Sequence, residues 1–166
     1  MKSILAFFIF IVGISCGFTK NQIIQNDIYQ KILTLVINSN QEKGLFEVCN
    51  DESFRVSEEV ISINAFEFLF YDEIKKHDND FLFSNVPNVK IVEESKSFSK
   101  LGTKRSSCII FFSEMKDGII FAELFTHSKR MKRYDGKLHF GTSRVYMFLI
   151  ENSDVRLVKS KELIYG

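Results

Sequence analysis

The sequence predicts a single α+β domain in which an N-terminal helix packs on an antiparallel meander of about four strands. Three observations predict this class: an early stripe of apolar residues with helical spacing, several apolar runs in the last third of the chain, and an Asp-Gly pair between two of those runs. A length of 166 residues fits one domain. The net charge of +1 and the 45% hydrophobic content argue against a disordered chain and against a broad nucleic-acid-binding surface.

Residues 1–15 have the pattern of a signal peptide. A lysine near the start supplies a positive charge, and the apolar run from Ile4 to Ile14 is too short to cross a bilayer core of about 30 Å as a helix. Small residues follow, so we expect cleavage after Ser15 or after Gly17, with residues 16–166 forming the domain. The alternative is a buried N-terminal helix or strand, which fits less well because the run is apolar on every face and a polar segment follows it.

Cys16 stands where a bacterial lipoprotein carries its acylated cysteine. Ser15 before it suits that processing, whereas Gly13 occupies a position where such sites prefer Leu, Val or Ile. A lipidated and a freely secreted form therefore both stay open. In either case we expect an exported protein, periplasmic or anchored in the membrane, and we expect membrane contact only through such a lipid anchor.

The other two cysteines are Cys49 and Cys108. Thiols in an oxidising compartment can pair, so export makes a disulfide between them a candidate. The alternative is two buried, independent thiols that behave as small hydrophobes. No Cys-x-x-Cys or Cys/His spacing in the sequence indicates zinc, and no metal or cofactor is predicted.

The first half of the chain predicts one clear helix and several weaker elements. A helix is expected from Asn26 to Asn38, held by tertiary packing because its β-branched content is high. A short strand is expected at Leu45–Cys49 and another at Val89–Val92. Between them, residues 57–77 carry mixed signals, and we predict a short extended piece followed by a helix over Ala65–Lys76. The helical stripe of the first helix consists of Ile28, Ile32, Leu35 and Val36.

The last third of the chain predicts the meander. Asp117-Gly118 separates two apolar runs, and this dipeptide is the strongest short signal for a β-hairpin because a two-residue turn needs positive φ angles. A long strand is then expected from Leu138 to Glu151, followed by a turn at Asn152-Ser153 and a final strand at Val155–Val158. Because both alternating sets in the long strand are apolar, we predict that it is central and buried on both faces: Tyr146, Phe148 and Ile150 on one, Val145, Met147 and Leu149 on the other.

The segment from His127 to Arg133 is the densest basic cluster. Held on a loop, its charges can attract phosphate, an acidic glycan or an anionic lipid surface. The alternative is a solvated loop that keeps neighbouring strand edges from pairing. The candidate anion-binding residues are Lys129, Arg130, Lys132 and Arg133.

No catalytic residue is predicted. The sequence lacks G-x-S-x-G, P-loop and G-x-G-x-x-G motifs, and its three histidines are not at metal-ligand spacing. If Phe125 pairs near Leu138, then Glu123 can approach His139 with Asp135 above, but ordinary surface or core histidines explain the pattern as well.

The signal peptide and four C-terminal stretches carry a resemblance. These stretches are Ile109–Ser113, Ala122–Leu124, Gly141–Tyr146 and Glu151–Val155. Together they resemble small uncharacterised exported proteins and lipoproteins of Bacteroidetes-type bacteria, best over residues 107–166. The sequence departs from that pattern where Val155 replaces a common Trp. The resemblance implies export and the fold and brings no activity with it.

These observations favour a non-catalytic binding or interaction module of the envelope or periplasm, whose partner is an envelope protein or ligand. Two alternatives stay open, a small pocket-bearing enzyme of hydrolase type and an immunity or inhibitor protein. A deep pocket with convergent polar groups would favour the enzyme, whereas a filled sheet face would favour the module.

Overall fold

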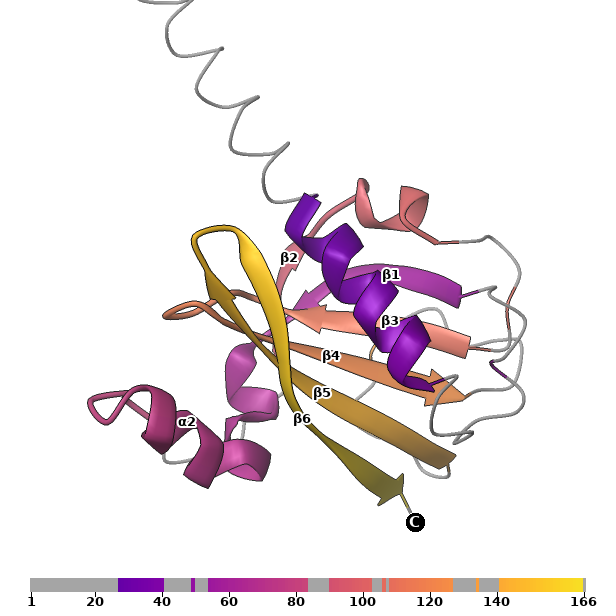
Figure 1. Cartoon of the computed structure of the whole chain (residues 1–166). Coiled ribbons are helices and arrows are strands. Elements are labelled where there is room, and N and C mark those ends of the chain that lie inside the picture. Colours follow the sequence, from indigo (N-terminus) through magenta and orange to yellow (C-terminus); the bar gives the residue numbers. More distant parts are fainter. Residues whose placement is uncertain are drawn as a thin grey trace, which may run out of the picture.

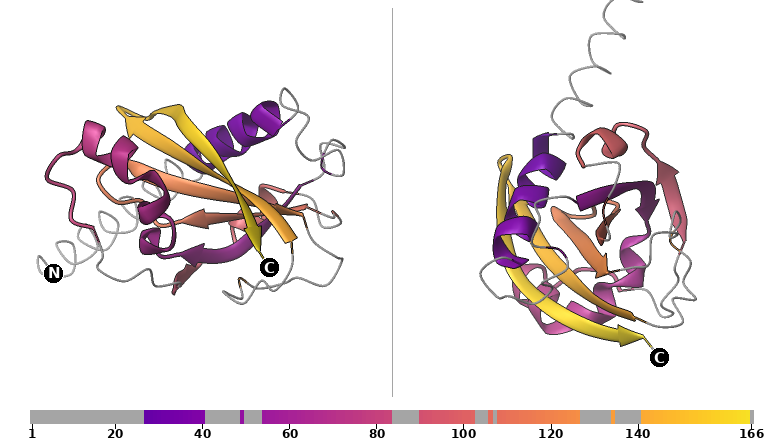
Figure 2. Two further views of the ribbon diagram at one scale, coloured as in Figure 1. Left: turned by 90° about the horizontal axis from the view of Figure 1, so that it is seen from below. Right: turned by 90° about the vertical axis from the view of Figure 1, so that its right-hand side faces the viewer.

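A mixed β-sheet forms the centre of the computed structural model, which describes residues 27–40, 49, 54–83, 90–102, 106, 108–126, 134 and 141–165. Six strands lie in the order β2-β1-β3-β4-β5-β6 (Figure 1). The N-terminal helix, residues 27–40, lies on one face, and a layer of short helices lies on the other (Figure 2). The strands are β1 Phe54–Ile61, β2 Ile91–Glu94, β3 Cys108–Ser113, β4 Ile119–Thr126, β5 Gly141–Glu151 and β6 Asp154–Tyr165.

The α+β class is confirmed in its coarse form, but the expected number of about four strands is wrong. Strands β3 to β6 pair antiparallel in sequence order and form a four-stranded meander. β1 adds to it in parallel with β3, and β2 pairs antiparallel with β1. The sheet described is therefore mixed and six-stranded.

The extended piece expected ahead of Ala65 overlaps the end of β1, but the strand begins earlier, at Phe54, where the local signals point elsewhere. Ser57, Glu58 and Glu59 suggest a helix start, yet all three lie inside the strand, with Ser57 and Glu59 buried. Pairing with β3, which follows far later in the chain, overrides this local preference. The helix expected over Ala65–Lys76 is also corrected: 3-10 helices η2 (Ile63–Ala65) and η3 (Glu67–Phe70) precede a short α2 (Tyr71–His77), and a further 3-10 helix, η4, covers Phe98–Lys100.

Two tight turns fix the register of the meander. Asp117 and Gly118 have φ angles of 51° and 73°, as the predicted two-residue hairpin turn requires. Asn152 and Ser153, with φ angles of 51° and 69°, turn β5 into β6 and place Glu151 opposite Asp154. β6 is much longer than the predicted Val155–Val158, because it pairs with β5 along its full length. The predicted residues 45–48 and 138–140 lie outside the described part of the chain.

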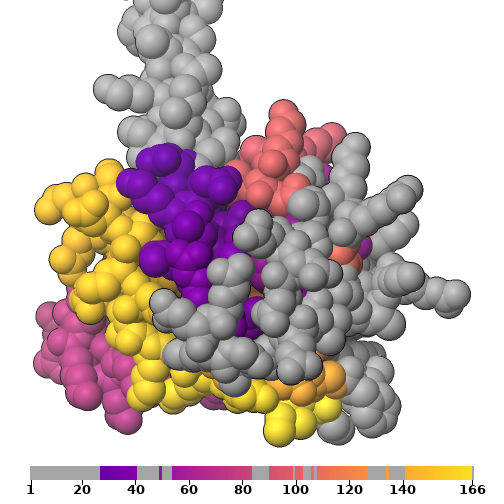
Figure 3. Space-filling view, turned by 45° about the vertical axis from the view of Figure 1, so that its right-hand side comes forward, coloured from indigo at the N-terminus to yellow at the C-terminus, as the bar shows by residue number. Residues whose placement is uncertain are grey.

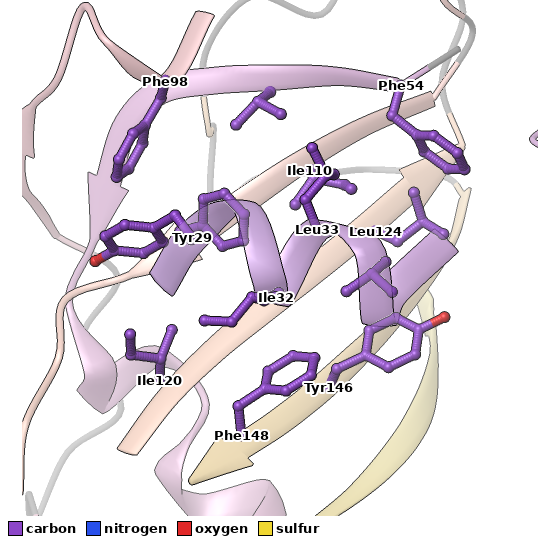
Figure 4. Packing of buried hydrophobic residues seen from close by; sticks show 14 of the residues in the cluster. Tyr29, Ile32, Leu33, Phe54, Phe98, Ile110, Ile120, Leu124, Tyr146 and Phe148 are labelled. Atoms are coloured by element: carbon purple, nitrogen blue, oxygen red, sulfur yellow. The ribbon is translucent and has the colours of Figure 1, made fainter. Parts of the chain in front are cut away.

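The first core lies between the N-terminal helix and one face of the sheet. Tyr29, Ile32 and Leu33 point from the helix onto side chains of the central strands (Figure 4). Tyr29 contacts Phe98 and Phe112, with ring centroids 4.5 and 4.9 Å apart. The sheet contributes alternate residues, among them Ile110, Ile120, Leu124, Tyr146 and Phe148.

The second core lies on the opposite face, under η3 and α2. Phe66 and Phe70 pack on Phe121, with ring centroids 5.8 and 5.3 Å apart. β5 supplies Val145, Met147 and Leu149 to this core and Tyr146 and Phe148 to the other. The prediction that β5 is central and buried on both faces is therefore confirmed.

Candidate functional site

The most unusual group in the described part of the molecule is the carboxyl of Glu123. Its strand β4 contributes Phe121 and Phe125 to the second core, and alternation along the strand places Glu123 between them on the same face. In register it lies between Phe111 of β3 and Val145 of β5. The side chain is 0% exposed. A carboxyl at such a position must be neutral or well hydrogen-bonded, because burying a lone charge is costly.

Two hydroxyl groups converge on one oxygen of this carboxyl. The Tyr165 hydroxyl at the end of β6 donates to Glu123 Oε1 at 2.6 Å, and Ser143 Oγ of β5 donates to the same atom. The Tyr134 hydroxyl also interacts with the carboxyl. Glu123 Oε2, by contrast, has no hydrogen-bond partner. We refer to Glu123, Ser143, Tyr165 and Tyr134 as the Glu123 cluster.

Burial controls the protonation of this cluster. Desolvation raises the pKa of Glu123 above its ordinary value of 4.5, although hydrogen bonds from Ser143, Tyr165 and Tyr134 oppose the shift. Desolvation also raises the pKa of Tyr134 and of Tyr165, and the neighbouring Glu123 charge raises both further. The cluster is therefore arranged to keep its protons.

Tyr134 links this cluster to β1. Its backbone N–H donates to Glu59 Oε2 at 2.6 Å, and its ring packs on Phe111 and Phe66 with centroids 5.0 and 6.4 Å away. Glu59 is itself only 5% exposed. One residue between β4 and β5 thus joins two buried acidic side chains and the second core.

The carboxyl at the centre of the cluster is fully buried, so in the described structure it has no exposed surface. Within the described ranges, no three His, Cys, Asp or Glu side chains gather as metal ligands. The predicted approach of Glu123 to His139 and Asp135 lies outside the described residues. In the sequence, the position of Glu123 as a single acid within the apolar run of β4 is a signal that it is buried. Nothing near it in the sequence indicates that Tyr134 and Tyr165 are its partners.

Cys49 and Cys108 form a disulfide whose Cα atoms are 5.8 Å apart. Both residues are buried in the first core, at 2% and 0% exposure. The bond ties the start of β3 to the segment that precedes β1. Cys16 and the basic residues Lys129, Arg130, Lys132 and Arg133 lie outside the described part of the chain, so their predicted roles remain predictions.

The described surface includes a groove and several exposed apolar side chains. A groove of about 390 Å³ runs between the N-terminal helix and the β5–β6 hairpin, coloured indigo and yellow in Figure 3. Phe68, Tyr71 and Leu82 lie on the α2 side of the molecule and are 54%, 52% and 80% exposed. The groove is lined by Lys31, Thr34, Leu35, Asp154 and Val155.

Comparison with known proteins gives no relative to this chain: no family model, curated protein or solved structure matches it. Among the described helices, none is both long and apolar enough to cross a membrane.

Proposed function

We propose that this chain is an exported protein of the periplasm or cell envelope that acts as a non-catalytic binding or interaction module. The observation that carries the proposal is the filled sheet. Side chains of the N-terminal helix cover one face, and those of η3 and α2 cover the other. Within the described residues, neither core leaves the sheet an open concave face of the kind in which small-molecule sites are usually built.

The groove supports the same conclusion. Lys31 Nζ already donates to the Ser153 carbonyl at 3.1 Å and lies 3.4 Å from Asp27. Glu123, the acid with the raised pKa, is not among the groove residues. An enzyme of the alternative, pocket-bearing type needs its perturbed acid in an accessible cleft, and here the two features are separate.

The disulfide supports export. Disulfides persist in oxidising compartments and are rare in the reducing cytosol. The Cys49–Cys108 bond is therefore consistent with the signal peptide expected at residues 1–15. We propose the same localisation that the sequence predicts, periplasmic or anchored through Cys16.

We propose that contact with a partner uses an apolar patch, defined as Phe68, Tyr71 and Leu82. Tyr71 packs on Phe83 with tilted rings whose centroids are 4.6 Å apart, and Lys116 Nζ donates to the Leu82 carbonyl at 2.8 Å. These contacts hold Tyr71 and Leu82 in place, while both side chains stay exposed. Exposed, preorganised aromatic and aliphatic side chains are typical of energetically important contact residues.

Capture from envelope extracts tests this function. The full chain, immobilised through a tag, is compared with Tyr71→Ser/Leu82→Ser and with Ile164→Ser, a control on β6 whose residue is as exposed as Leu82 (82% against 80%). We expect the wild type and the control to retain a stoichiometric partner that the patch variant loses. Equal retention by all three proteins would reject the patch, and turnover of a substrate without a lasting complex would favour the enzyme.

A further inference from the structure

We propose that Glu123 is a protonation-controlled latch: while its carboxyl is neutral, Tyr134 and Tyr165 close over this part of the second core, and its ionisation favours an opened form in which water reaches the carboxylate. This device is separate from the proposed binding function. It rests on the convergence of β4, β5, β6 and Tyr134 on one buried carboxyl.

The surroundings of Glu123 explain why its charge matters. Within the described residues its hydrogen-bond donors are both hydroxyl groups, from Ser143 and Tyr165. The strands on either side place Phe111 and Val145 beside it in register. A carboxylate here would have no described cation to balance it, and Oε2 would lack even a hydrogen bond.

Charged groups on neighbouring elements do not offset the cost of a charge on the buried Glu123 carboxyl. Lys161 of β6 lies opposite Val145, which in turn lies opposite Glu123, so it is two strands away. Its Nζ is engaged by the Leu69 carbonyl and lies over the Phe70 ring. On β1, Glu59 accepts the Tyr134 N–H, and Arg55 alternates with Phe54 and Val56 of the first core, so it lies on the Glu123 side of the sheet but two strands away, paired with Ile109.

Tyr134 and Tyr165 are the side chains of the cluster that can move away from Glu123. Tyr165 is the last described residue of β6 and follows Ile164, which is 82% exposed. Tyr134 is held by its N–H bond to Glu59 and by contacts to Phe111 and Phe66. Water can reach an ionised Glu123 if these two side chains move.

The direction of the pH effect follows from linkage. In the opened form Glu123 regains a pKa near 4.5, and in the closed form burial holds the pKa higher. The closed form therefore binds the proton more tightly. Between about pH 4.5 and the raised pKa, the opening equilibrium grows up to about tenfold per pH unit, and it is flat outside that window.

Amide hydrogen exchange on the full chain tests the latch. The Tyr134 amide is a direct reporter because its hydrogen bond to Glu59 breaks when Tyr134 leaves. We expect the protection factors of Tyr134 and Tyr165, corrected for intrinsic rates, to fall with rising pH in the wild type and to stay constant in Glu123→Gln. The matched control is Glu59→Gln, which keeps an acceptor for the same amide and should retain the pH dependence.

Two results would overturn the proposal: pH-independent protection in the wild type, or loss of the pH dependence in Glu59→Gln with its persistence in Glu123→Gln. If Glu123→Gln fails to fold, carbon-detected NMR titration of the wild-type carboxyl groups decides whether Glu123 controls the opening. The latch requires Glu123 to titrate above 4.5 together with the change in Tyr134 exchange. Titration of Glu123 at or below its ordinary value would refute it.

Discussion

Removing the disulfide should remove much of the stability of this domain. The perturbation is Cys49→Ala/Cys108→Ala, in which both buried sulfurs are replaced and no lone thiol remains. The bond joins positions 59 apart in the sequence, and closing a loop of that length in the unfolded chain is worth about 4 kcal/mol at 25 °C in the chain-entropy model. Because folded domains have only about 5–15 kcal/mol of stability, this is a large share.

Urea unfolding followed by circular dichroism and tyrosine fluorescence measures the effect, since the chain has five Tyr and no Trp. We expect the double variant to lose about 3–5 kcal/mol, with a larger dependence on urea because its unfolded state is less restricted. As a control, wild-type protein is reduced under denaturing conditions and refolded in reductant. This form keeps both sulfurs, so its stability separates the contribution of the cross-link from that of side-chain packing. A loss below about 1 kcal/mol in both forms would refute the reasoning.

Three further predictions concern the core, the buried acid and the basic segment. Phe148→Ala should cost roughly 3–5 kcal/mol in urea unfolding, because its side chain is fully buried in the first core; a loss under about 1 kcal/mol would contradict that packing. The unfolding free energy of the wild type should fall as pH rises from about 4.5 to the raised pKa of Glu123 and then level off, because the folded state holds this proton more tightly than the unfolded state. Glu123→Gln should lack this fall, and an identical pH profile in the variant would count against a raised pKa. Replacing Lys129, Arg130, Lys132 and Arg133 with Ser should change stability by less than about 0.5 kcal/mol per site and weaken any salt-sensitive binding to anionic vesicles; a misfolded variant would instead make this segment a structural element.

Much of the meander could be predicted because its signals are local. Asp117-Gly118 specifies a turn through the backbone freedom of glycine, and the observed φ angles agree. The doubly apolar pattern of β5 indicated a strand covered on both faces, and both cores confirm it. Local sequence carries this information because turn geometry and side-chain alternation depend on neighbouring residues only.

The features that could not be predicted depend on distant partners. β1 contains Ser57, Glu58 and Glu59, and it is a strand because it pairs with β3 and β2, which both follow later in the chain. Tyr165 is 42 positions from Glu123, so nothing near either residue indicates their hydrogen bond. The same holds for Tyr134, which reaches Glu59 from a position 75 residues later.

Thiol trapping with intact-mass analysis of the chain recovered from a bacterial host tests the central claim, an exported domain closed by a disulfide, most directly. Cells that express the full chain are fractionated and alkylated before and after reduction under denaturing conditions. We expect a protein in the envelope or periplasmic fraction that lacks residues 1–15 or 1–17 and whose Cys49 and Cys108 are alkylated only after reduction. A full-length cytosolic chain whose Cys49 and Cys108 react without reduction would contradict it.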